Sequence, residues 1–107
     1  MGRRVLVTGL GAVSALGRDV PGLRERLTAG SPGFGPLEGL PVNDLRTRIG
    51  AQVRDLVPSE LFLPKELPLL DRFSQLALLA GREAVADAGL VPEDLARAAA
   101  VVGTGCG

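Results

Sequence analysis

The sequence predicts an α/β layered fold, because two apolar runs are separated by helical patterns. Residues 4–8 (RVLVT) and 99–102 (AAVV) are short and rich in small or β-branched apolar residues, which is typical of buried strands. Residues 71–88 lie between them and repeat apolar side chains at helical spacing. Strands separated by helices favour an α/β architecture, with right-handed crossovers if the strands are parallel.

The first expected strand runs into a loop and then a short helix. Residues 9–17 (GLGAVSALG) hold three glycines, which predicts a tight loop. Asp19 is a suitable N-cap, Pro21 suits the first helical turn and Gly30 suits the end of a helix. We therefore expect a helix at residues 20–29.

The next segment, residues 31–67, is expected to be mostly irregular. It contains prolines at positions 32, 36, 41, 58 and 64, together with several glycines. Only residues 49–53 have the composition of a short strand. An irregular segment of this length in a small domain is either a functional surface or a surface that is covered by polypeptide not present in this sequence.

The strongest periodic pattern predicts a helix at residues 71–88, which Gly89 ends. Its apolar face is dominated by small side chains, which indicates close approach to a flat partner such as a sheet or another helix. The residues of this face are Phe73, Leu76, Ala77, Ala80, Ala84 and Ala88. Pro92, followed by two acids, begins a further short helix that we expect to reach residue 98.

Composition and charge narrow the classes of function. The chain has 107 residues, enough for one small core, and its 12 basic and 12 acidic residues cancel. A formal charge of +0 disfavours binding to nucleic acid or to an anionic membrane surface. No apolar stretch approaches the roughly 20 residues of a membrane span, and the N-terminus has no signal-peptide pattern. We expect a soluble, cytoplasmic protein.

The scarcity of histidine and cysteine excludes several catalytic sites. With no histidine and one cysteine, the chain cannot form a His/Cys zinc site, a Ser-His-Asp triad or a Cys-His dyad from its own residues. It has no disulfide framework, which fits a reducing cytosol. Cys106 lies between two glycines and is the one candidate thiol nucleophile. Because no histidine can deprotonate it, packing or pocket lining is the favoured role.

The glycines after the first strand invite comparison with a dinucleotide-binding loop. Gly9 and Gly11 match the first two glycines of that pattern, but Ser14 occupies the third position. The short-chain reductase variant also fails, because Val13 and Ala15 stand where its glycines would fall. A structural turn is therefore favoured. A stand-alone nucleotide-binding domain stays an alternative, and it would bind NAD(P) or ATP.

Four stretches together resemble one family. Residues 3–17 are similar to the opening of the elongating β-ketoacyl-acyl-carrier-protein synthases, condensing enzymes of the thiolase superfamily. Three further stretches agree in order and spacing. They are residues 27–33 (LTAGSPG), residues 71–75 (DRFSQ) with 84–90 (AVADAGL), and residues 102–107 (VGTGCG).

The resemblance implies a thiolase-like, five-layered αβαβα fold, incomplete on its own. Residues 1–107 would be the N-terminal portion of this synthase domain. The implied reaction is decarboxylative Claisen condensation of an acyl thioester with malonyl-carrier protein, in fatty-acid or polyketide synthesis. The family's nucleophilic cysteine and its two histidines lie downstream of residue 107. We therefore expect no catalytic residue, no metal and no cofactor in this chain, and no activity from it alone.

The resemblance also implies partners and two site residues. The partners are an acyl carrier protein and a second subunit, in a homodimer or a heterodimer with a related synthase. Cys106 matches a position that lines the acyl-chain pocket near the dimer interface. Lys65 is what remains of a basic cluster that docks the carrier protein, since Pro68 and Leu69 replace basic residues. The proline also resembles the non-catalytic chain-length-factor subunits, which are the alternative function. Acyl-chain length and pathway stay open.

Overall fold

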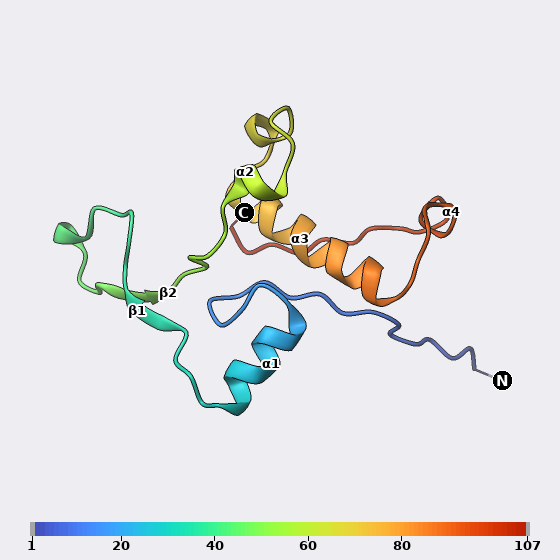
Figure 1. Cartoon of the computed structure of the whole chain (residues 1–107), viewed down its shortest axis with the longest axis horizontal. Coiled ribbons are helices and arrows are strands. Elements are labelled where there is room, and N and C mark those ends of the chain that lie inside the picture. Colours follow the sequence, from blue (N-terminus) through green and yellow to red (C-terminus); the bar gives the residue numbers. More distant parts are fainter. Residues whose placement is uncertain (1, 107) are drawn as a thin grey trace.

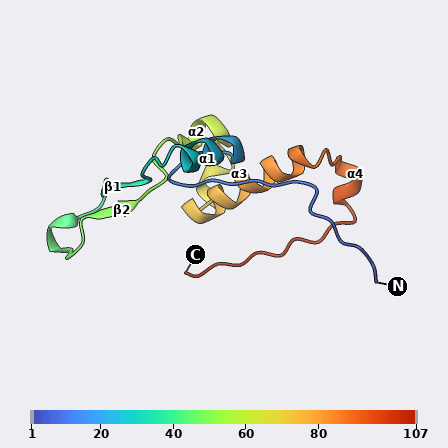
Figure 2. The ribbon, with the colours of Figure 1, turned by 90° about the horizontal axis from the view of Figure 1, so that it is seen from below.

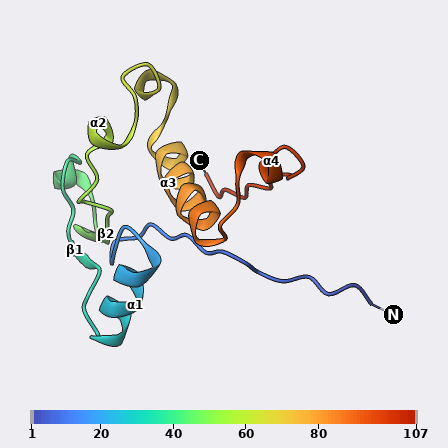
Figure 3. The ribbon, with the colours of Figure 1, turned by 45° about the vertical axis from the view of Figure 1, so that its right-hand side comes forward.

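A computed structural model describes residues 2–106 of the chain. Helix α3 lies at the centre, with α1 and the β1–β2 pair to one side and α4 beyond its C-terminal end (Figures 1 and 3). The elements, in order, are α1 (Val20–Thr28), β1 (Phe34–Pro36), η1 (Val42–Asp44), β2 (Ile49–Ala51), α2 (Pro58–Leu61), η2 (Leu67–Leu69), α3 (Arg72–Asp87) and α4 (Pro92–Leu95).

Helix α1 confirms the capping pattern of the sequence. The Asp19 carboxylate accepts a hydrogen bond from the Gly22 N–H at 2.7 Å, and Pro21 lies in the first turn. The helix ends at its C-cap, Ala29, and Gly30 follows with a φ of 68°, a left-handed conformation that glycine adopts without steric cost. Local signals therefore mark both ends of α1.

The only sheet among residues 2–106 is the antiparallel pair of β1 and β2. Strand β2 confirms the strand expected from residue 49, although it ends at Ala51. Strand β1 was not expected, because it contains Gly35 and Pro36. Proline is tolerated there because a two-stranded sheet consists of edge strands, where one N–H can be missing from the ladder.

Helix α3 agrees with the expected helix to within one residue at each end. Part of its alanine face, at Ala80, Ala84 and Ala88, is closely approached, and the partner is residues 9–17 and not a sheet or another helix. Phe73 and Ala77, at the other end of that face, are exposed. A Cβ atom on Gly11 would collide with the Ala80 carbonyl, and one on Gly9 would collide with the Ala84 carbonyl. The two glycines therefore allow the loop to lie directly on the helix backbone.

The two outer strands predicted by the sequence are wrong for this structure. Residues 4–8 and 99–102 are extended but belong to no sheet, so no parallel pair or crossover forms among the described residues. Figure 2 shows the C-terminal stretch running apart from the helices. Val5 is 92% exposed and Val101 is 96% exposed. The physical reason is that a strand needs a hydrogen-bonding neighbour, which the described residues do not supply.

The molecule is much more open than a compact domain of its length. Its radius of gyration is 16.8 Å, whereas about 13 Å is usual for this many residues. Its accessible surface is 8812 Å², about 3,200 Å² more than a folded monomer of this mass exposes. Among the described residues only Leu56 and Phe62 are buried hydrophobics. A large apolar surface is thus left without a core to cover it. Within residues 2–106, no helix is both long and apolar enough to cross a bilayer.

Candidate functional site

The best-defined tertiary contact fixes residues 9–17, here called the glycine loop, to helix α3. The two oxygens of the Glu83 carboxylate accept separate backbone hydrogen bonds. Oε2 accepts from the Ala12 N–H at 2.8 Å, and Oε1 accepts from the Val20 N–H at 2.7 Å. Both bonds are partly buried. One side chain therefore joins the glycine loop, the start of α1 and helix α3.

Asp87 adds a third bond one helical turn further along α3. Its Oδ2 accepts from the Leu10 N–H at 3.0 Å. Glu83 and Asp87 are spaced i, i+4, so both carboxylates project from the same side of the helix. We call these two residues the carboxylate clamp. Neither acid was predicted to belong to a site, and Glu83 lies outside the apolar face predicted for this helix. The available signal was the spacing of two acids beside an alanine face.

The glycine loop also closes on itself. The Ser14 N–H donates to the Gly17 carbonyl at 2.8 Å, and the Gly17 N–H donates back to the Ser14 carbonyl at 3.3 Å. The Leu16 N–H donates to Ser14 Oγ at 3.1 Å. Beside Gly9 and Gly11, the space that a pyrophosphate would need is filled by the backbone of α3. Close packing against α3 therefore accounts for both glycines, which agrees with a structural role for this loop and not with a pyrophosphate site.

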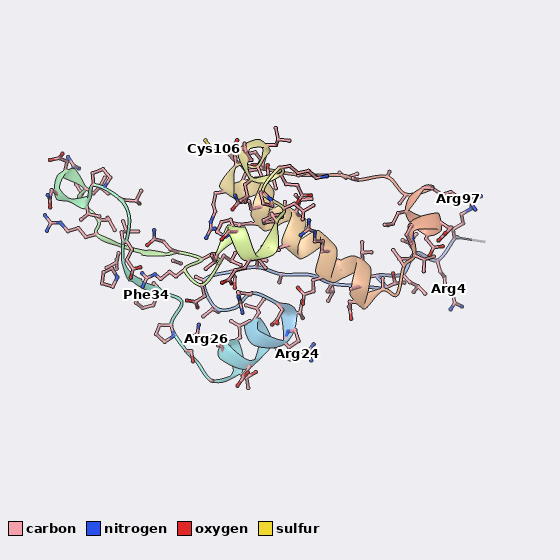
Figure 4. The ribbon with its side chains drawn as sticks, turned by 45° about the horizontal axis from the view of Figure 1, so that its top comes forward. Arg4, Arg24, Arg26, Phe34, Arg97 and Cys106 are labelled. Carbon is pink, nitrogen blue, oxygen red and sulfur yellow. The ribbon has the colours of Figure 1, made fainter. Side chains whose placement is uncertain are left out.

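The two residues that the sequence singled out are both exposed. Cys106 is a free, exposed thiol at the end of the extended C-terminal stretch. Figure 4 shows it on the opposite side of that view from Arg26 and Phe34. Lys65 is exposed in the turn between α2 and η2, where the Glu66 carboxylate accepts from the Leu63 N–H at 2.7 Å. Their roles in acyl-chain and carrier-protein binding stay predictions.

The described residues hold few groups suited to catalysis. No group of three or more His, Cys, Asp or Glu side chains among residues 2–106 could hold a metal ion. The sequence has no histidine that could act as a general base. What the hydrogen bonds of the clamp hold together is the glycine loop, the start of α1 and helix α3.

Comparison with known proteins identifies the family. Residues 2–107 match the family model described as the N-terminal domain of β-ketoacyl synthase. The chain belongs to the β-ketoacyl synthase family. This confirms the resemblance, and the structure is that of a fragment of a ketosynthase N-terminal domain, with few strands among the described residues.

Individual relatives agree with this assignment. The chain is 38% identical to nodulation protein E of Rhizobium sp. (strain N33), over 98% of this chain and 26% of the relative. It is 37% identical to 3-oxoacyl-[acyl-carrier-protein] synthase 2 of Coxiella burnetii, with the same coverage. Among solved structures, the ishigamide ketosynthase/chain length factor is similar with a TM-score of 0.77 and 33% identity, over 86% of this chain and 23% of that one. The chain spans about a quarter of the length of the curated relatives it matches.

Proposed function

We propose that this chain is the N-terminal portion of a β-ketoacyl-acyl-carrier-protein synthase. The observation that carries the proposal is the family match over residues 2–107, joined by relatives that are themselves 3-oxoacyl-[acyl-carrier-protein] synthases. In the proposed reaction, an acyl group is held as a thioester on the enzyme. Loss of CO₂ from malonyl-carrier protein supplies the carbanion that attacks the acyl carbon, and the enzyme thiol leaves.

In this proposal the chain supplies scaffold and pocket but no reacting group. The carboxylate clamp and the two close-packed glycines hold the glycine loop against α3. The exposed apolar stretches at residues 4–8 and 99–102 supply surface for sheet partners from the rest of the domain. These features support a domain portion that becomes compact when its remaining layers are added.

We propose Cys106 as a lining residue of the acyl-chain pocket. The resemblance of residues 102–107 to the family supports this role, and the thiol is small and exposed at the end of an extended stretch. At a position that lines the pocket, a larger side chain would occupy space that the acyl chain needs. In the intact protein, Cys106→Phe should shift the product distribution toward shorter chains, whereas the matched Cys106→Ala variant should keep or lengthen it. Mass spectrometry of the products tests this, and equal distributions for the two variants would remove Cys106 from the pocket.

We propose that Lys65 contributes to docking of an acidic acyl carrier protein. Its ammonium group is exposed in a turn and takes part in no ion pair among residues 2–106. Lys65→Glu should raise the KM for acyl-carrier protein and leave kcat nearly unchanged, because docking precedes the chemistry. Arg97→Glu, an exposed charge reversal after α4, is the control. An equal rise in KM for both variants would indicate a general charge effect.

The second candidate is a non-catalytic partner subunit of the chain-length-factor type. Pro68 in place of a basic residue favours it, as does the similarity to the ishigamide ketosynthase/chain length factor. Both candidates imply a dimer, either of two copies or with a related synthase subunit. Incubation of the intact protein with an acyl thioester separates them. A synthase gains the mass of one acyl group, whereas a partner subunit gains none and supports condensation only beside a second subunit.

A further inference from the structure

A small basic cavity lies between the glycine loop, α1 and the end of β2. Its volume is about 210 Å³, and three arginines from three different segments line it. Arg18 precedes α1, Arg26 lies in the last turn of α1, and Arg54 follows β2. Asp55 is the one acidic residue in the lining. Three positive charges and one negative charge therefore surround this cavity in a chain whose formal charge is +0.

Each of the three guanidinium groups donates to a backbone carbonyl, that of Arg54 to Pro36, and a carbonyl does not neutralise the charge. Arg18 donates through Nη1 to the Asp55 carbonyl, and Arg26 donates through Nη1 to the Leu16 carbonyl, each at 3.2 Å. Each arginine has five N–H donors, so most remain available. The one ion pair among residues 2–106 joins Arg54 to Glu38 at 3.2 Å. Arg18 and Arg26 therefore carry charge that no carboxylate within the described residues pairs.

We propose that this cavity binds a phosphate group. Guanidinium forks suit phosphate and carboxylate oxygens, but a planar carboxylate presents its two oxygens in one plane. Donors that approach from three segments suit a tetrahedral oxyanion better. Ser14 also lines the cavity, and its hydroxyl can add a fourth donor. The volume is below the range of roughly 300–1,000 Å³ of drug-sized ligand sites, so it suits a single phosphoryl group.

The test is calorimetric titration of the intact protein with inorganic phosphate at low ionic strength, where screening is weak. The expected Kd is about 1 mM. Arg18→Gln and Arg26→Gln should each weaken binding by about tenfold, the equivalent of ~1.4 kcal/mol. Arg24→Gln is the matched control, because it removes the same charge from α1 at an exposed position outside the cavity lining. An equal loss in the Arg24 variant would overturn the proposal, as would no heat of binding to the parent protein.

A gain of affinity provides the sharper result. Glu38→Gln removes the carboxylate partner of Arg54, a lining residue, so that its guanidinium keeps only the bond to the Pro36 carbonyl and its charge is no longer paired. Phosphate should then bind several-fold more tightly, and unchanged or weaker binding would contradict the assignment. Circular dichroism of each variant checks folding, and Arg26→Lys replaces Arg26→Gln if the latter unfolds.

Parallel titrations identify the source of the group and the competing ligand class. Glycerol 3-phosphate binding more tightly than inorganic phosphate would indicate a phosphoryl group on a larger ligand. Inorganic phosphate binding more tightly would indicate the free ion, and either order supports the proposal. Acetate or an acidic peptide binding more tightly than both would overturn it in favour of a carboxylate. None of these measurements depends on condensing activity, so they can fail while the proposed function holds.

Discussion

Replacement of Glu83 by alanine should destabilise the protein by about 2–4 kcal/mol. The substitution removes two hydrogen bonds to one carboxylate, at 2.8 Å from the Ala12 N–H and 2.7 Å from the Val20 N–H. A hydrogen bond to a charged group contributes roughly 1.5–3 kcal/mol. Both hydrogen bonds are only partly buried, so water can bind the two freed N–H groups and recover part of the lost free energy. The expected loss is therefore smaller than the full contribution of two such bonds. The expected value is therefore a large share of the stability of a domain of this size.

The measurement is urea unfolding of the intact protein followed by circular dichroism. Glu83→Ala should lower the midpoint at unchanged m-value, which reports a change of stability and not of compactness. Glu83→Gln should lose about half as much, roughly 1–2 kcal/mol, because an amide oxygen replaces only one of the two acceptors. Glu25→Ala is the control, since Glu25 is an exposed helical acid whose carboxylate makes no hydrogen bond within residues 2–106. Equal midpoints for the Glu83 and Glu25 alanine variants would refute the clamp.

Three further substitutions, one of them a control, test the contact between the glycine loop and α3. Gly11→Ala should destabilise by at least about 2 kcal/mol in urea unfolding, because the new Cβ would collide with the Ala80 carbonyl. Gly81→Ala, in α3 with nothing within 4 Å of its Cβ position, should instead stabilise by about 0.5–1 kcal/mol. The same sign for both alanine variants would mean that the loop does not lie on α3. Ala80→Phe should overpack this contact at a cost of about 1–3 kcal/mol, and an unchanged melting temperature would show that the alanine face is open.

The sequence was most informative where the determinants are local. Asp19, Pro21 and Gly30 lie within or beside α1, so the helix could be predicted from neighbouring residues. Helix α3 was predicted from the repeat of its own side chains. Residues 4–8 and 99–102 have strand composition, but composition does not supply a pairing partner, and the described chain leaves both unpaired.

The candidate site depends on contacts between distant segments, which explains what was missed. Glu83 and Ala12 are 71 residues apart, and no local pattern links a helix acid to a loop amide at that separation. The alanines of α3 predicted that another segment approaches this helix closely. They did not predict that this segment is the glycine loop, because the glycines of the loop are equally suited to a turn. The arginine-lined cavity combines three segments and was likewise invisible in the sequence.

The proposed condensing activity is tested most directly by supplying the intact protein with acyl-carrier protein and malonyl-carrier protein. We expect release of CO₂, a β-ketoacyl product and a transient acyl adduct on the enzyme. The Cys106→Ala variant should still form this adduct, because Cys106 is not the nucleophile. If the intact protein forms no adduct and no product, either alone or beside a related synthase subunit, the proposed activity is contradicted.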